Sequence, residues 1–90
     1  MPTVVFTSAL QRFLAVPTLR VEGAATVGDA LAAVFATEPA LRGYLLDDQR
    51  ALRRHVAVYV NGRPVIDRQG LADPVGPDDE IYVFQALSGG

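Results

Sequence analysis

The most distinctive chemistry in the sequence belongs to its last four residues, Leu87, Ser88, Gly89 and Gly90. Ser88 and the two glycines carry little or no side-chain bulk, so such a tail can thread a narrow channel in which a Cβ would clash. Extended, the four residues span roughly 13 Å. A terminal carboxylate is a poor electrophile because of its charge and resonance, so covalent use of this end requires activation by an enzyme. The alternative is a flexible end without a function.

Other side chains offer weaker candidates for catalysis. The sequence contains no cysteine, which excludes disulfides, thiolate metal sites and a thiol nucleophile. His55 has no partner at metal-ligand spacing, so we expect no metal site. The acidic pairs Asp47-Asp48 and Asp78-Asp79 lie beside turn signals, where solvated loop residues are the ordinary interpretation. We therefore expect no catalytic group in the chain itself and no bound cofactor.

Composition limits the class of protein. The 90 residues suffice for one core, and half of them are hydrophobic. The net charge of −2 and the dispersed arginines offer no electrostatic footprint for nucleic acid. The sequence has no run of eighteen apolar residues and no leader pattern, so we expect a cytoplasmic protein that does not enter the membrane. Arg53-Arg54 forms a small basic spot that suits an acidic partner, although a solvated surface is the ordinary interpretation.

The first half of the sequence predicts a hairpin and a helix. Apolar residues alternate over Thr3–Thr7, with Val4 and Phe6 on one face, and again at Leu19 and Val21. Thr26 is a candidate N-cap for a helix whose apolar stripe extends from Val27 to Glu38. Residues 41–46 favour a further short helical turn, and the polar composition of residues 47–55 predicts a connecting segment.

The second half predicts a hairpin and a final strand. Residues 56–60 (VAVYV) alternate, and Asn61-Gly62 supplies the two positive-φ residues of a type I′ turn. Pro64 lacks an N–H, so we expect the return strand, around Val65 and Ile66, at a sheet edge. In the last strand, within IYVFQAL, Ile81 and Val83 are expected to face the core.

The same alternation predicts a docking surface. Ala57, Tyr59, Tyr82 and Phe84 should lie on the sheet face away from the helix, with Val5 beside them. Grouped exposed aromatic residues often mark a protein contact. The alternative is that a loop or the termini cover these side chains.

The element order is therefore β-β-α-β-β-β, an α+β fold in which a mixed sheet of four to five strands packs on one main helix. This is the β-grasp, or ubiquitin-like, architecture. We expect residues 1–86 to form this domain and residues 87–90 to form a flexible tail.

The sequence resembles the ThiS/MoaD family of sulfur carriers over nearly its whole length, and the CysO type most. The opening strand, TVGDALAAVF, LLDDQRALRRHVAVYVNGRPV, GPDDEIYVF and the terminal Gly-Gly carry the resemblance. It implies a carrier that is not an enzyme. Gly90 would be adenylated and then converted to a thiocarboxylate, while Leu87 anchors the tail at the channel mouth and Ser88 and Gly89 lead into a partner's active site.

The resemblance also implies partners. An E1-like adenylyltransferase and sulfurtransferase would use ATP to activate the carrier. In the CysO type, a PLP-dependent cysteine synthase accepts the sulfur and a metallopeptidase releases the cysteine. A thiazole-synthase-like enzyme, the large subunit of molybdopterin synthase, or thiosugar and other natural-product pathways are alternative acceptors.

Three other functions are consistent with the same sequence features. The chain could be a ubiquitin-like modifier joined to lysines, a static supporting subunit, or the small subunit of a molybdopterin-synthase-like complex. The sequence does not distinguish which pathway receives the sulfur.

Overall fold

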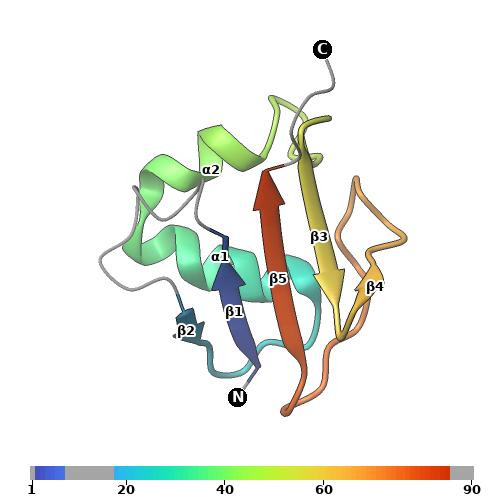
Figure 1. Cartoon of the computed structure of the whole chain (residues 1–90). Coiled ribbons are helices and arrows are strands. Elements are labelled where there is room, and N and C mark those ends of the chain that lie inside the picture. Colours follow the sequence, from blue (N-terminus) through green and yellow to red (C-terminus); the bar gives the residue numbers. More distant parts are fainter. Residues whose placement is uncertain (1, 8–17, 86–90) are drawn as a thin grey trace.

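The computed structural model describes residues 2–7 and 18–85. These residues form one five-stranded sheet with two helices on one of its faces (Figure 1). The strands are β1 (Thr3–Phe6), β2 (Thr18–Arg20), β3 (Val56–Val60), β4 (Arg63–Pro64) and β5 (Glu80–Gln85), and the helices are α1 (Val27–Thr37) and α2 (Pro39–Leu45). The predicted fold class, a mixed sheet covered by one main helix, is confirmed.

Strand β5 lies at the centre of the sheet, in the order β2-β1-β5-β3-β4. It pairs in parallel with β1, in a register that sets Thr3 opposite Glu80 and Phe6 opposite Val83. On its other side it pairs antiparallel with β3, and β2 pairs antiparallel with β1 as the predicted first hairpin. The first and last strands of the described chain are therefore neighbours in the middle of the sheet.

Helix α1 begins where the sequence predicts. The Thr26 hydroxyl oxygen accepts a hydrogen bond from the Asp29 N–H (3.1 Å) in the first turn, and the Asp29 carboxylate accepts one from the N–H of Ala25 (3.2 Å), the residue before the N-cap. The buried stripe of α1 is Val27, Ala30, Leu31 and Val34.

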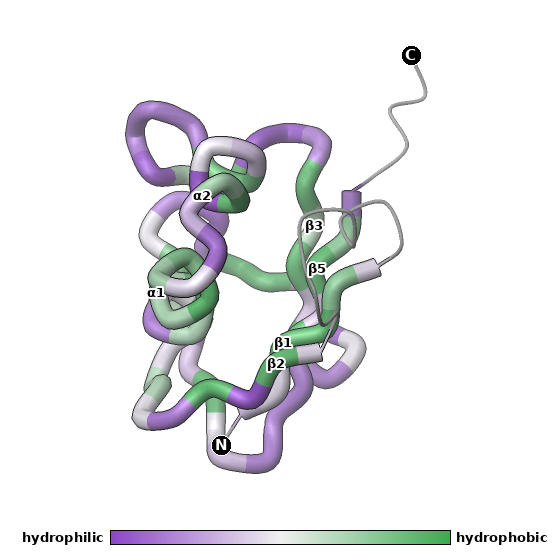
Figure 2. Tube along the Cα trace, turned by 90° about the vertical axis from the view of Figure 1, so that its left-hand side faces the viewer, coloured by the Kyte–Doolittle hydropathy of each residue, from purple (hydrophilic) through white to green (hydrophobic). Residues whose placement is uncertain are grey.

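This stripe packs on the inner face of the sheet. Val4, Phe6, Ile81 and Val83 are at most 1% exposed, as the alternation predicts. Figure 2 shows the helices and the sheet as two layers. Burial of these side chains between the layers supplies the main favourable term in folding.

The β3–β4 hairpin has the predicted turn but a different return strand. Asn61 and Gly62 have φ values of 50° and 83°, as a type I′ turn requires. β4 consists of Arg63 and Pro64 rather than residues around Val65 and Ile66, and it lies at the sheet edge as predicted.

Asp73 explains why β4 ends early. Its carboxylate accepts the N–H groups of Ile66 and Asp67, both at 2.8 Å, and so draws these amides away from the sheet. The Val65 N–H still donates to the Val58 carbonyl oxygen (2.9 Å). The Ile66 side chain is left 91% exposed.

The segment between α2 and β3 is not simply a polar connector. Leu52 is 6% exposed and belongs to the core, its N–H donates to the Arg68 carbonyl oxygen (2.9 Å), and it forms an isolated bridge with Leu46. One leucine within a polar stretch thus ties this segment to the domain. Its isolation in the sequence hides it from periodicity arguments.

Asp67 organises the turn that follows Ile66. Its carboxylate accepts backbone hydrogen bonds from Gly70 (2.8 Å), Ala72 (3.2 Å) and Gln69 (3.2 Å). The N–H groups of Gly70 and then Ala72 hold the pKa of this carboxyl below its usual value of 3.8.

We predict that Asp67→Asn lowers the stability of the fold at neutral pH and makes it less dependent on pH. A carboxyl whose pKa is lowered by folding contributes stability above its unfolded pKa of 3.8 and loses that contribution as pH falls through the lower folded value. Urea unfolding at about pH 7 and about pH 2.5 should therefore show a difference between the original chain and the variant that shrinks in acid.

Asp48→Asn is the matched control for this experiment. Asp48 is exposed and, in the described part of the chain, its carboxylate accepts no hydrogen bond. An equal effect of both variants at both pH values would contradict the role of the Asp67 turn.

Candidate functional site

The structure brings the four residues predicted for docking together on one face. Across the β3–β5 pair, Ala57 lies opposite Phe84 and Tyr59 lies opposite Tyr82. We call Ala57, Tyr59, Tyr82 and Phe84 the aromatic patch. Figure 2 shows both helices on the other side of the sheet, so no described helix covers the patch.

The three rings of the aromatic patch pack against one another. Tyr59 meets Phe84 edge-on with ring centroids 5.5 Å apart, and Tyr82 stacks on Phe84 at 6.3 Å. Together with Gly62 they line an open hollow of about 280 Å³. Phe84 is 37% exposed. Aromatic contacts of this kind hold side chains in place before binding, and a preformed apolar hollow suits a partner's side chain.

Val5 extends the apolar surface toward β1. It pairs with Tyr82 across the β1–β5 ladder and is half-buried. Because side chains alternate along a strand, the burial of Val4 and Phe6 in the core requires Val5 to point outward. The arrangement predicted for Val5 is therefore present.

The carboxyl end of β5 is held by a contact that the sequence did not reveal. The Tyr44 hydroxyl donates a hydrogen bond to Gln85 Oε1. The Tyr44 ring also meets the His55 ring edge-on, with centroids 5.6 Å apart. We call these three residues the β5 clasp: Tyr44 from α2, His55 from the turn just before β3, and Gln85 from the end of β5.

The predicted tail, Leu87 to Gly90, lies outside the described residues, as does the boundary at residue 86. The β5 clasp fixes the last described residue, Gln85, from which the chain continues to the tail. The predicted roles of the tail residues therefore stay predictions. The sequence predicts that His55 is an ordinary surface or strand-edge residue. In the structure it lies in the β5 clasp, where its ring contacts the Tyr44 ring.

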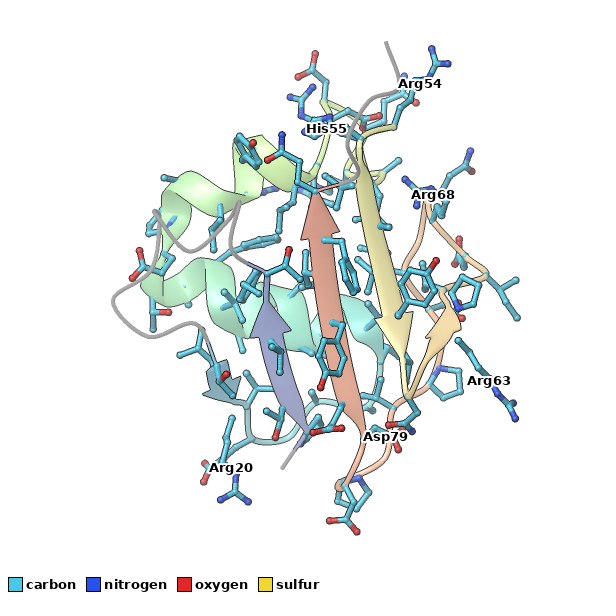
Figure 3. The ribbon with its side chains drawn as sticks, viewed as in Figure 1. Arg20, Arg54, His55, Arg63, Arg68 and Asp79 are labelled. Atoms are coloured by element: carbon cyan, nitrogen blue, oxygen red, sulfur yellow. The ribbon has the colours of Figure 1, made fainter. Side chains whose placement is uncertain are left out.

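Arginines gather around this end of the sheet (Figure 3). The Arg68 guanidinium donates to the carbonyl oxygens of Arg53 (2.9 Å) and Val56 (2.7 Å), and Arg53 Nε donates to the Gly43 carbonyl oxygen (3.0 Å). Of the predicted basic pair, Arg53 thus braces the backbone, whereas Arg54 is exposed.

The acidic residues at the opposite end of β5 serve the turns there. The Asp79 carboxylate accepts hydrogen bonds from the Gly76 N–H (2.7 Å) and Asn61 Nδ2 (2.8 Å). These two donors, Gly76 first, lower the pKa of Asp79. Asn61 Oδ1 in turn accepts the Glu80 N–H (2.9 Å), so the acidic stretch joins the β3–β4 turn to β5.

Residues 2–7 and 18–85 contain no group of three or more His, Cys, Asp or Glu side chains that could hold a metal ion. Within the same part of the chain, neither helix is long and apolar enough to cross a membrane.

Known proteins resemble the chain in sequence and structure. A model of the ThiS family matches residues 7–90. Small archaeal modifier protein 3 from Haloferax volcanii is 38% identical over 71 residues, which cover 79% of this chain and 76% of that protein.

Solved structures share the whole fold. The crystal structure of small archaeal modifier protein 1 from Haloferax volcanii has a TM-score of 0.80 at 31% identity, covering 99% of this chain and 98% of that one. A crystal structure of the BexX/CysO complex from Amycolatopsis orientalis contains a chain with a TM-score of 0.85 at 25% identity, with full coverage of both chains.

We predict that Tyr44→Phe loosens the end of β5 without unfolding the domain. Loss of one side-chain hydrogen bond should raise the hydrogen-exchange rate of the Gln85 amide about two- to tenfold. NMR exchange measurements on the full chain test this. Tyr82→Phe, which removes a hydroxyl from the aromatic patch, is the matched control, and equal rates in both variants would contradict the clasp.

Proposed function

The chain belongs to the ThiS family, and from that premise we propose that it is a ubiquitin-like sulfur carrier whose reactive group is the Gly90 carboxylate. The observation that carries the proposal is the extent of the family match, which includes β5 and continues through Gly89 and Gly90. In this function the chain is a co-substrate of other enzymes rather than an enzyme.

The proposed chemistry has two steps. An activating enzyme joins the Gly90 carboxylate to the α-phosphate of ATP, releasing pyrophosphate and leaving an acyl-adenylate. A hydrosulfide ion then attacks the acyl carbon, the bond to AMP breaks, and loss of the sulfur's proton leaves a thiocarboxylate. A persulfide in its place would first give an acyl disulfide, whose S–S bond a thiol of the enzyme must reduce before the thiocarboxylate is free. The thiocarboxylate is ionised and nucleophilic near neutral pH, so it transfers sulfur while remaining attached to the chain.

The described domain is suited to present such a tail. The central position of β5 and the β5 clasp hold Gln85 in place, while the aromatic patch on β3 and β5 offers a surface for the enzyme. In our proposal the enzyme binds Tyr82 and Phe84 while Leu87 lies at its channel mouth and Ser88 and Gly89 enter the channel. The tail lacks bulk, which favours entry.

We favour a cysteine synthase as the sulfur acceptor, followed by a metallopeptidase. The support is the similarity to a chain of the BexX/CysO complex, which covers all of both chains, because the CysO type is the one for which the sequence resemblance implies these two enzymes. The alternative acceptors are a thiazole-synthase-like enzyme, an enzyme of a thiosugar or other natural-product pathway, and the large subunit of molybdopterin synthase. In the last case the chain would be the small subunit of that complex.

A second function, conjugation to lysines of other proteins, has its own support. The 38% identity to small archaeal modifier protein 3 favours it. The adenylate is common to both functions, and only the nucleophile that attacks it differs: sulfur in a carrier and a lysine amine in a modifier.

We predict that incubation with the activating enzyme from the same organism, ATP and sulfide increases the intact mass by the exchange of one oxygen for one sulfur. Mass spectrometry of the full chain measures the product. Deletion of Gly90 should abolish it, whereas Ile66→Ala, far along the chain from the tail, should leave it unchanged.

The controls separate the two functions. An unchanged mass in the presence of an enzyme that forms the adenylate would contradict the sulfur-carrier proposal. Recovery of tagged chain from cells in isopeptide linkage to other proteins, together with that unchanged mass, would establish the modifier instead.

We predict that Tyr82→Ala and Phe84→Ala each raise the KM for activation about tenfold or more, because large aromatic side chains dominate the affinity of protein interfaces. ATP–pyrophosphate exchange measures KM, and circular dichroism verifies that the variants fold. Ile66→Ala is the matched control, since Ile66 is 91% exposed and lies outside the aromatic patch. A KM equal to that of the control would exclude the patch as the docking surface.

A further inference from the structure

Helix α1 has an apolar surface where a helix normally meets water. After Asp29 it carries no charged residue. Ala32 and Ala36 are exposed, and Phe35, which packs in part against the core, is half-buried. A surface helix usually presents polar side chains on the side away from the core. An apolar outer side is typical of a helix that something else covers.

This side of α1 forms one wall of a groove of about 760 Å³. It is lined by three buried leucines, Leu31, Leu46 and Leu71, together with Phe35 and Pro39. The other walls are α2 and the turn containing Gly70. The groove is thus large enough and apolar enough to receive several side chains.

Two arginines line the same groove. Arg42 lies in the last turn of α2, and Arg50 lies in a turn whose Asp47 carboxylate accepts the N–H groups of Gln49 (2.8 Å) and Ala51 (3.1 Å). In the part of the chain that the structure describes, neither guanidinium has a hydrogen-bond or ion-pair partner.

The charged side chains among the groove's described lining residues are both basic, although the chain is acidic. Acidic residues outnumber basic ones by 10 to 8 in the sequence, yet no carboxylate is among the groove's described lining residues. An apolar groove with two unpaired guanidinium groups is complementary to apolar side chains next to carboxylates.

We propose that this groove binds an acidic, apolar peptide segment of a partner protein. Its apolar side chains lie against Phe35, Leu46 and Leu71, and its carboxylates pair with Arg42 and Arg50. A second copy of the chain fits less well, because a two-fold contact would set this groove against itself and bring the arginines of both copies together.

The groove and the aromatic patch lie on opposite layers of the domain, the helices and the sheet (Figure 2). Both surfaces are therefore available at once. The groove would hold the chain on one protein while the sheet face and the tail engage another. This binding requires no thiocarboxylate and is independent of the proposed function.

The test is an NMR titration of the full ¹⁵N-labelled chain with a peptide of sequence Leu-Glu-Leu-Leu-Glu-Leu, acetylated and amidated at its ends. We expect saturable chemical-shift changes at the amides of Ala36, Arg42 and Gly70 as the peptide concentration rises to about 1 mM. The matched peptide with glutamine in place of both glutamates should bind more weakly.

Variants of the chain locate the contact. Arg42→Gln combined with Arg50→Gln should weaken binding about threefold or more, and Ala36→Glu should weaken it by adding a carboxylate to the apolar wall. Arg54→Gln, which removes an exposed arginine outside the groove, is the matched control and should have no effect.

Three results would overturn the proposal. They are the absence of saturable shifts, equal binding of the two peptides, and shifts centred on Tyr59 and Tyr82. Groove shifts that depend on protein concentration without peptide would assign the groove to a second copy and would also overturn it. None of these results bears on thiocarboxylate formation, so the two proposals fail separately.

Discussion

The pairing of β5 with both β1 and β3 is the constraint on which the rest of the structure depends. Because β5 is hydrogen-bonded to a neighbouring strand on each edge, its register is fixed. Each of its side chains must therefore point to one particular face of the sheet. Ile81 and Val83 enter the core under α1, and Tyr82 and Phe84 therefore must lie at the centre of the open face. A shift of one residue in register would exchange these pairs and remove the core and the aromatic patch together.

Local patterns were sufficient to predict much of this arrangement. The alternation of Val56, Val58 and Val60, the Asn61-Gly62 turn and the Thr26 cap each depend on a few neighbouring residues, and the structure confirms them. The aromatic patch followed from the same alternation once the helix was assigned to the other face. Neither step needed knowledge of distant contacts.

The missed features all depend on particular contacts that follow no periodic pattern along the sequence. Asp73 ends β4 by accepting amides seven and six residues earlier, and Leu52 reaches the core from a polar segment. Tyr44 meets Gln85 across 41 residues. Because side-chain hydrogen bonds of this kind have no period, no window along the sequence reveals them. The groove is likewise formed by α1, α2 and two turns, and it exists only once they pack.

The chemistry of the proposed tail cannot by itself specify a pathway. A carrier and a modifier share the adenylate, and two glycines offer an active site almost no side chain to recognise. Discrimination between partners must then come from the folded domain. The domain has two surfaces of different character, the uncharged aromatic patch on the sheet and the arginine-lined groove on the helices. Since they lie on opposite layers, one surface can be common to every enzyme that uses the tail while the other selects a single partner.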